Sequence, residues 1–499
     1  MSIQRPVPRR PTGTRDLFRE NVVGRRRMID TIRTVYELYG FMPLETPALE
    51  YVDALGKFLP ESNQPDAGIF ALQEPGSGRG EWIGLRYDLT APLARVFAQH
   101  RHDLPMPYRR YQVGPVWRVQ KPGPDSFREF YQFDFDTIGA TSSVADAEVC
   151  CVLSDAFEAL GISRGQYVVR VNNRKVLNGV LEVAGINALD GGRISPIGLS
   201  TLRAIDKLDR LGEESVRELL GAGRKDESGD FTGGAGLSNE QSDRLFKFVG
   251  LRADTRRQVC DQLIPLVGAS RVGREGVEEL EQIDEVLTTL AYGEDRVVFD
   301  PSIVRGLEYY TGPVFEAELK FKVPDERGGE RPFGSVAGGG RYDYLVERFL
   351  GELIPATGAS IGVDRLYKAL SAMKLAGGET VATCVVVAVL SPGRMSEYVR
   401  IAAELRSADV PSEVYVGSGG LDKQLKYANT RGAIAVVIAG DDEFRKGTVS
   451  IKDLRAGLVS STDVHERERW VRTRPGQEEV PRDQVVPTVR AIFARHGAT

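Results

Sequence analysis

The clearest pattern in the sequence is an alternation of apolar and polar side chains in two neighbouring segments, residues 108–119 and 127–138. In both, the odd positions are mostly apolar or aromatic and the even positions are mostly polar. A period of two residues is typical of strands with one buried face. The linking segment, residues 120–126, contains glycine and two prolines. The two segments therefore predict an antiparallel hairpin.

The polar face of this hairpin has an unusual composition. It carries Arg118, Arg128, Gln132 and Asp136. Strand faces that are only solvated usually mix Lys, Glu and Thr, whereas this one is dominated by Arg, Gln and Asp. We interpret it as the lining of a binding site.

Helical spacing of apolar residues over positions 21–39 predicts a helix that ends at Gly40. The next segment, residues 41–50, contains Pro43 and Pro47, which cannot donate hydrogen bonds to a strand ladder. It is predicted at a sheet edge or an interface, with an ordinary loop as the alternative.

Residues 84–98 have the pattern of a strand end that enters a helix, with Pro92 in the tolerated first turn. Asp88 or Thr90 is suited to cap that helix. A carboxylate at such a junction can instead accept a ligand's ammonium group. Both roles of Asp88 are compatible with the sequence.

Residues 161–295 are mostly helical in pattern and are interrupted by a glycine-rich polar tract, residues 221–236, predicted as a loop. Residues 144–160 predict a helix before this region. From residue 381, strands alternate with helices, which predicts a small α/β domain with a largely parallel sheet. The expected strands are 381–390, 411–416 and 434–439, and the expected helices are 392–405 and 421–429.

An apolar run at residues 297–299 leads into Arg305, then Tyr309 and Tyr310, then a Gly-Pro turn. The planar guanidinium of arginine suits an oxyanion, and the two phenols offer ring faces and hydroxyl groups to a small polar molecule. The alternative is a tyrosine pair that packs across strands and a solvated arginine.

Two further segments carry small residues beside charged ones. In Gly338-Gly-Gly-Arg-Tyr-Asp343 the glycines allow a ligand to approach the backbone, but no Gly-Lys-Ser/Thr follows, so this is not a phosphate loop. Residues 357–366 have the pattern of a strand that enters a helix, with Arg365 at the junction.

Composition limits which partners, metals and cellular locations are compatible with the sequence. Lys plus Arg is 65 and Asp plus Glu is 70, giving a net charge of -5, which neither requires nor excludes a nucleic-acid partner. Four cysteines without a Cys-x-x-Cys pair or a histidine cluster argue against zinc and against disulfides. There is no run of 18 apolar residues and no apolar segment after the basic N-terminus. We expect a cytoplasmic protein with no membrane segment.

Taken together, these motifs resemble those of class II aminoacyl-tRNA synthetases, specifically the histidyl-tRNA synthetase family. The class motifs correspond to the Pro47 segment, the hairpin with Arg118, and residues 362–366. Two segments are similar to signatures of the histidine family, Arg305-Gly-Leu-Glu-Tyr-Tyr-Thr-Gly312 and Gly339-Gly-Arg-Tyr-Asp343. The similarity spans nearly the whole chain.

This resemblance implies an α+β fold with an antiparallel sheet flanked by helices. It divides the chain into a catalytic core (residues 1–160 and 296–375), an inserted mostly helical domain (161–295) and a C-terminal α/β anticodon-binding domain (381–499). The Pro47 segment is expected to support a homodimer.

The activity implied is ATP-dependent conversion of L-histidine to histidyl-adenylate and transfer to the 3′ end of tRNA(His), with ATP as substrate together with Mg²⁺. By resemblance, Arg118 and Arg365 hold the ATP phosphates, and Arg305 contacts the α-phosphate; Arg305 and Arg118 are the catalytic residues. The histidine pocket implied by the family comprises Asp88, Leu89, Thr90, Gln132, Asp136, Arg305, Tyr309 and Tyr310.

One alternative is a synthetase-like regulatory subunit of histidine biosynthesis, which binds histidine without charging tRNA. Such paralogues generally lack the anticodon domain and the intact catalytic arginines, and both features are retained here. A tRNA-sensing module would need an effector domain, for which the chain has no room. The hairpin loop, residues 120–126, lacks the family's Arg-Gly-Arg pattern and keeps only Arg128 after it, so the sequence leaves recognition of the acceptor end open.

Overall fold

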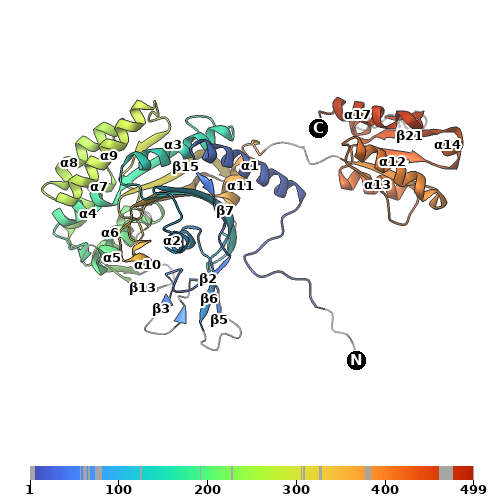
Figure 1. The fold of residues 1–499 in the computed structure, drawn as a ribbon. Helices are drawn as coiled ribbons and strands as arrows, with labels where there is room; N and C mark the ends of the chain where they lie inside the picture. The colour runs from blue at the N-terminus through green and yellow to red at the C-terminus, as the bar shows by residue number, and fades with distance from the viewer. Residues whose placement is uncertain are drawn as a thin grey trace. The chain divides into compact units, whose positions relative to one another are not determined.

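The chain divides into two compact units, Met1–Ala376 and Gly377–Thr499 (Figure 1). The computed structural model describes residues 6–56, 58–59, 64–65, 68–73, 81–123, 126–190, 193–225, 229–304, 306, 309–324, 329–376, 384–459 and 476–497.

Within the described residues of the first unit, eight strands form one sheet in the order β1-β7-β8-β17-β16-β15-β9-β14. In this order, every neighbouring pair between β7 and β9 is antiparallel. Only the edge strands β1 and β14 run parallel to their neighbours. The predicted hairpin and the antiparallel sheet are confirmed, and Pro43 lies on an edge strand. The strands are β1 (Met42–Pro43), β7 (Tyr108–Trp117), β8 (Glu129–Ile138), β9 (Tyr167–Asn173), β14 (Val297–Phe299), β15 (Pro313–Pro324), β16 (Glu330–Arg341) and β17 (Ala356–Gly362).

Helices surround this sheet, and α4, α7, α8 and α9 group together beside it (Figure 1). The predicted helices at 21–39 and 144–160 are confirmed as α1 and α3. The helices are α1 (Arg19–Leu38), α2 (Thr90–Gln99), α3 (Val144–Ala159), α4 (Arg174–Val183), α5 (Pro196–Ile205), α6 (Leu208–Leu220), α7 (Asn239–Val249), α8 (Arg256–Val267), α9 (Arg271–Thr289), α10 (Glu347–Leu350) and α11 (Val363–Ala372).

Short strands form small separate sheets. The glycine-rich tract, predicted as a loop, instead contains two paired strands, β12 and β13. Glycine makes this pairing possible, because a Cβ at Gly223 or Gly234 would collide with backbone atoms of the same tract. The short strands are β2 (Leu49–Tyr51), β3 (Phe58–Leu59), β4 (Gln64–Pro65), β5 (Ala71–Gln73), β6 (Trp82–Leu85), β10 (Leu189–Asp190), β11 (Arg193–Ile194), β12 (Gly223–Lys225) and β13 (Phe231–Gly233).

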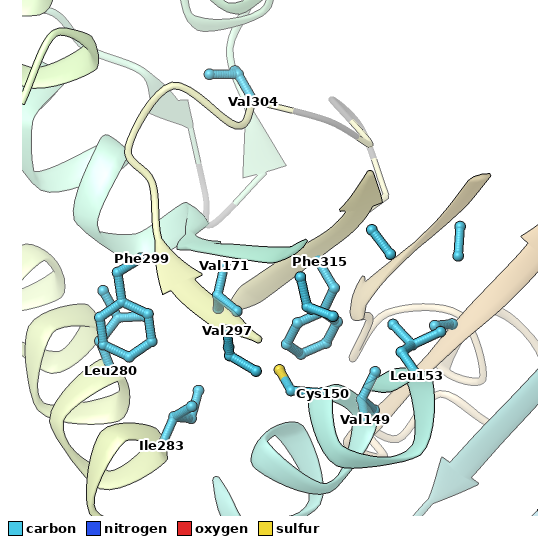
Figure 2. Packing of buried hydrophobic residues seen from close by; sticks show 14 of the residues in the cluster. Val149, Cys150, Leu153, Val171, Leu280, Ile283, Val297, Phe299, Val304 and Phe315 are labelled. Atoms are coloured by element: carbon cyan, nitrogen blue, oxygen red, sulfur yellow. The ribbon is translucent and has the colours of Figure 1, made fainter. Parts of the chain in front are cut away.

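Alternation along the strands gives the main sheet two different faces. The apolar face packs against α1 and α3; the ring of Tyr36 lies 4.8 Å from that of Phe133 and 4.7 Å from that of Phe135. Figure 2 shows the continuation of this core between β9, β14, β15 and the helices α3 and α9, with Val149, Cys150, Leu153, Val171, Leu280, Ile283, Val297, Phe299 and Phe315. The opposite face carries the polar residues of β7 and β8.

The second unit contains a five-stranded sheet, counted over its described residues, in the order β19-β18-β20-β21-β22. Its elements are β18 (Val385–Val389), η1 (Pro392–Arg394), α12 (Met395–Ser407), β19 (Ser412–Val414), α13 (Leu421–Arg431), β20 (Ala435–Ala439), α14 (Asp441–Lys446), β21 (Thr448–Asp453), α15 (Leu454–Val459), β22 (Gln477–Pro481), η3 (Arg482–Gln484) and α17 (Val485–Arg495).

The prediction of a largely parallel sheet in this unit was wrong in part. Strand β18 is parallel to β19 and β20, but β21 and β22 are antiparallel to their neighbours. The connection from β20 to β21 holds only the six-residue helix α14. A parallel crossover needs a dozen or more residues, so this short connection returns the chain in the antiparallel direction.

A buried ion pair ties helix α3 to the end of β16. Arg341 Nη2 lies 2.5 Å from Asp146 Oδ2, and the side chains are 8% and 1% exposed. Arg341 also donates to the carbonyl oxygen of Ala140 at 2.7 Å. Burial raises the pKa of Asp146 to about 6, and the neighbouring guanidinium opposes this shift. Removing the cation therefore leaves a carboxylate buried without its partner.

Arg341→Met is expected to lower the free energy of unfolding of the first unit by about 3–5 kcal/mol, the usual cost of removing one member of a buried ion pair. Urea unfolding followed by tryptophan fluorescence measures it. The control is Arg271→Met, whose side chain is 89% exposed and pairs with Glu275; it is expected to cost no more than about 1 kcal/mol. Equal losses in the two variants would contradict this interpretation.

Candidate active site

On the polar face of the main sheet, a row of paired residues runs across four neighbouring strands, β7, β8, β17 and β16. Strand register places Arg110 opposite Asp136, Asp136 opposite Gly358, and Gly358 opposite Gly340. A Cβ at position 358 would collide with Asp136 Oδ1, and a Cβ at position 340 would lie 2.7 Å from the ring of Tyr310. The two glycines therefore leave room for a carboxylate and an aromatic ring side by side.

The carboxylate of Asp136 is held from both sides. The Tyr342 hydroxyl donates to Oδ1. Arg110 Nη2 lies 2.6 Å from Oδ2, and both side chains of this ion pair are buried. Burial raises the pKa of Asp136, while Arg110 and Tyr342 act in the opposite direction. The orientation of this acidic group is thus fixed.

The segment that enters helix α2 lies against the same row. Asp88 Oδ1 accepts a hydrogen bond from the backbone N–H of Ala91 at 2.9 Å, so Asp88 caps the helix. Its pKa is raised by burial and lowered by this bond and by Arg118. The carbonyl oxygen of Leu89 accepts from Arg110 Nη2 at 3.0 Å. The capping interpretation is therefore confirmed, and it leaves the second carboxylate oxygen of Asp88 outside this bond.

A second buried carboxylate, Asp134, lies one row away on the same strand. Thr90 Oγ1 donates to Asp134 Oδ2 at 3.4 Å. Burial raises the pKa of Asp134 to about 7, and Arg110 opposes the shift. The acidic groups from β8 and from the start of α2 thus share the field of one guanidinium.

Arg118 links this region to the outer end of the hairpin. Its Nε donates to the carbonyl oxygen of Tyr87 at 3.0 Å, and its Nη2 lies 3.5 Å from Gln132 Oε1. Gln132 Nε2 donates to Ser360 Oγ at 2.6 Å. The guanidinium carbon lies 5.0 Å from the centre of the Phe130 ring. Arg118 therefore has a fixed position, with Gln132 beside it.

The two tyrosines of the Arg305–Gly312 segment complete the polar face. Their ring centres are 5.3 Å apart with an edge-to-face geometry, and the ring of Tyr309 is 5.4 Å from that of Tyr342. The hydroxyl group of Tyr309 is buried and has no hydrogen-bond partner among the described residues. Burial, with Asp88 and Asp136 nearby, raises the pKa of Tyr309 well above its usual value. This hydroxyl group remains a neutral donor.

The two segments that resemble histidine-family signatures bind each other. The Thr311 hydroxyl donates to Asp343 Oδ2 at 2.7 Å, and the Thr311 backbone N–H donates to the carbonyl oxygen of Arg341 at 2.8 Å. Between them, Tyr342 donates to Asp136. The sequence placed these segments 30 residues apart, and the β15–β16 hairpin brings them together.

A cavity of about 740 Å³ opens at the outer end of the hairpin. Arg118 and Arg365 both line it, together with Phe130. Arg365 Nη2 donates to the carbonyl oxygen of Phe333 at 3.0 Å. Two of the three arginines assigned to ATP by resemblance therefore face one space. Arg305 lies outside the described residues; its neighbour Val304 is a buried residue of the loop after β14 (Figure 2).

The wall of this cavity includes residues that the sequence pattern did not single out. Arg15 Nη2 and Arg25 Nη1 lie 2.5 Å and 3.3 Å from Asp364 Oδ1. The other oxygen, Oδ2, accepts from the backbone N–H of Tyr131 at 2.8 Å. The segment before α1 is thus fastened to the hairpin through a residue next to Arg365.

Arg110 and Tyr342 were also missed as site residues. Position 110 is one of the even, polar positions of the segment 108–119, and no role was predicted for it. A hairpin with strands at 108–119 and 127–138 pairs position 110 with position 136, so the register contained a signal for Arg110. Tyr342 had no such local signal, because its partner lies 206 residues away.

The described residues include neither a cluster suited to hold a metal ion nor a helix suited to cross a membrane. Among the residues that the structure describes, no group of three or more His, Cys, Asp or Glu side chains is placed to hold a metal ion. No helix in the described part of the chain combines the length and the apolar character needed to cross a membrane.

Comparison with known proteins agrees with this geometry. A family model described as histidyl-tRNA synthetase matches residues 13–366, and a model described as an anticodon-binding domain matches residues 384–492. The histidine–tRNA ligase of Cereibacter sphaeroides is 54% identical over 98% of this chain and 99% of its own length. That of Caulobacter vibrioides is 48% identical over 98% of this chain and 97% of its own length.

Solved structures show the same likeness. A crystal structure of histidyl-tRNA synthetase from a Nostoc species has a TM-score of 0.71 at 29% identity and covers 98% of this chain and 100% of that one. A structure described as an ATP phosphoribosyltransferase regulatory subunit/histidyl-tRNA synthetase from Bacillus halodurans has a TM-score of 0.64 at 25% identity, covering 86% of this chain and 98% of that one. On these matches, and with the class II motifs assembled on one sheet, the chain belongs to the histidyl-tRNA synthetase family.

Proposed function

We propose that the chain activates L-histidine with ATP to form histidyl-adenylate and then transfers the histidyl group to the 3′ end of tRNA(His). The observation that carries this proposal is the position of Arg118, which lines the large cavity and also contacts Gln132, one of the residues assigned to histidine. The curated relatives that match nearly the full chain are histidine–tRNA ligases.

The first step joins two anions, since a histidine carboxylate oxygen attacks the α-phosphorus of ATP and pyrophosphate leaves. Such a step depends on positioning and on cations that stabilise the transition state. Arg118 and Arg365 face one cavity and supply two fixed positive charges. Arg305 is assigned to the α-phosphate by the family resemblance, which puts it in the same step.

The amino group and carboxylate of histidine are assigned to the end of the row near α2. Asp88 and Thr90 lie where the chain enters that helix, and Gln132 lies beside Arg118. A carboxylate, a hydroxyl group and an amide together match an ammonium group and a carboxylate. Arg118 would then contact both the amino acid and the nucleotide, which suits a group at the reacting centre.

The imidazole is assigned to the pocket made by Asp136, Tyr309 and Tyr310. Its two ring nitrogens need one acceptor and one donor when the ring is neutral. Asp136 supplies a fixed acceptor, and the buried Tyr309 hydroxyl supplies a donor. A ring without these nitrogens would leave the buried Tyr309 hydroxyl group without a hydrogen-bond partner, which penalises the wrong amino acid.

Mg²⁺ fits this site as a companion of ATP. The ion typically keeps several waters and binds through substrate phosphates with only one or two carboxylates, so it needs no dedicated acidic cluster. When bound, the ion would neutralise charge on the phosphates, while Arg118 and Arg365 hold the triphosphate in place.

The second unit is the part that we assign to the tRNA anticodon, because the anticodon-binding family model covers most of it. Residues 161–295 are proposed as an inserted, mostly helical domain, although strand β9 within this range belongs to the main sheet. A homodimer is proposed through the Pro47 region, where Met42, Leu49 and Tyr51 are 46–47% exposed.

The four buried free thiols suit a reducing cytoplasm.

The activity is tested by histidine-dependent exchange of pyrophosphate into ATP, with and without total tRNA. We expect exchange that requires histidine and does not require tRNA, followed by histidyl-tRNA formation when tRNA is added. A histidine-binding regulatory subunit would show neither reaction. Exchange supported equally by other amino acids would also contradict the proposal.

Arg118→Ala is expected to reduce the rate of adenylate formation by about a hundredfold or more, the scale of losing one contact that stabilises charge in a transition state. Arg33→Ala, on the outer face of α1 with its side chain 44% exposed, serves as the control and should keep the normal rate. Measuring kcat for pyrophosphate exchange decides between them. A nearly normal rate in Arg118→Ala would remove this residue from the mechanism.

Asp136→Ala is expected to raise the KM for histidine by about tenfold or more while leaving the KM for ATP nearly unchanged, because the lost group is a charged hydrogen-bond acceptor for the imidazole only. Both constants come from the same exchange assay. If the two KM values rise together, the substitution has disturbed the fold, and the role of Asp136 in recognising the ring is not supported.

A further inference from the structure

The buried arginine at position 110 has no role in the family assignment above. Its side chain is 0% exposed and projects from β7 onto the polar face of the main sheet. Burying a cation costs several kcal/mol unless close partners compensate it. Arg110 is therefore not a solvent-exposed charge, and its close polar partners must offset the cost of burying it.

Those partners belong to both ends of the proposed histidine pocket. A single nitrogen, Nη2, lies 2.6 Å from Asp136 Oδ2 and donates to the carbonyl oxygen of Leu89 at 3.0 Å. Asp136 is assigned to the imidazole, and Leu89 lies between the two residues assigned to the ammonium group. One guanidinium thus joins the ring end and the backbone end of the pocket.

The Leu89 contact helps to fix the segment before α2. Arg118 holds the carbonyl oxygen of Tyr87, and Arg110 holds that of Leu89. Asp88 lies between these two fixed carbonyl groups and is further held by its bond to Ala91. Replacing Arg110 would remove the hydrogen bond to the Leu89 carbonyl oxygen and so free one end of this segment.

The charge of Arg110 also matters for Asp136. Several ionisable groups face this carboxylate: Tyr342 after β16, Tyr309 in the loop before β15, Asp88 before α2, Asp134 on its own strand and Arg110 on β7. Arg110 is the cation in this set, and the hydrogen bond from Tyr342 also favours the ionised form, whereas the carboxyl groups of Asp88 and Asp134 disfavour ionisation of Asp136. Without the cation, burial and the neighbouring carboxylates would favour the protonated form.

We propose that Arg110 is a positioning residue that makes the pocket selective for a ligand with an imidazole ring, by keeping Asp136 as an oriented, ionised acceptor and fixing Leu89 at the other end. Arg110 itself touches no reacting atom. The proposal rests on the assignment of the histidine pocket given above and adds the residue that controls its charge.

The test compares full-length Arg110→Met and Arg110→Lys variants in histidine-dependent pyrophosphate exchange between pH 7 and pH 9. For Arg110→Met we expect the KM for histidine to rise about tenfold or more at pH 7, with kcat and the KM for ATP changing little. Removing the cation raises the pKa of Asp136, so this KM should fall as pH rises and the carboxyl group ionises. Arg110→Lys keeps the charge and should restore a low, pH-independent KM.

A matched control separates this role from simple structural support. Arg256 is also buried, at 2% exposure, and its Nε lies 2.6 Å from Asp284 Oδ1 in the helical region. Arg256→Met should reduce stability without changing the KM for histidine or its pH dependence. Equal KM values in the two methionine variants, or a parallel loss of ATP binding in Arg110→Met, would overturn the proposal.

A mutant cycle covers the case in which Arg110→Met does not fold. Asp136→Asn has no carboxyl group to titrate, so adding the charge-removing Arg110→Gln to it should leave the KM for histidine independent of pH, whereas Arg110→Gln alone should make this KM fall as pH rises. A pH-dependent KM in the double variant, or a pH-independent KM in Arg110→Gln alone, would contradict the proposal. A parent protein without any histidine-dependent exchange would instead refute the proposed function.

Discussion

The ion pair between Arg110 and Asp136 is the constraint on which the polar face of the main sheet depends. Two opposite charges are buried side by side on neighbouring antiparallel strands, with their positions set by strand register. A buried pair of this kind contributes little net stability but is costly to break. It therefore specifies geometry: the orientation of one carboxylate and the position of the chain that enters α2 follow from it.

Successive side chains of a strand point to opposite faces of the sheet, so one face forms the core and the other carries polar groups. Phe133 and Phe135 point into the core with α1, while Gln132, Asp134 and Asp136 point to the opposite side. A rigid core beneath the strands keeps the polar groups at fixed spacings, which suits chemistry that depends on placement more than on a covalent nucleophile. The cavity that we propose for ATP and the pocket that we propose for the amino acid both include residues of the β7–β8 hairpin.

Much of this could be predicted from local patterns. The alternation at 108–119 and 127–138 predicted the hairpin, and apolar spacing predicted α1 and α3. The assignment of residues to histidine came from the family resemblance and stays a prediction. What escaped prediction depends on distant partners: Arg341 pairs with Asp146 and Tyr342 with Asp136, each about 200 positions away. The sheet of the second unit was predicted to be largely parallel, but only β18, β19 and β20 are parallel. The connection from β20 to β21 is too short for another parallel crossover.

The glycines at 340 and 358 shape the pocket by what they lack. Their missing Cβ atoms create the space that the Tyr310 ring and the Asp136 carboxylate occupy. Since glycine is already the smallest residue, no substitution at either position can enlarge the pocket. Engineering this scaffold to accept a bulkier amino acid must therefore begin with the aromatic wall, and exchanges at the two glycines can only make the pocket more restrictive.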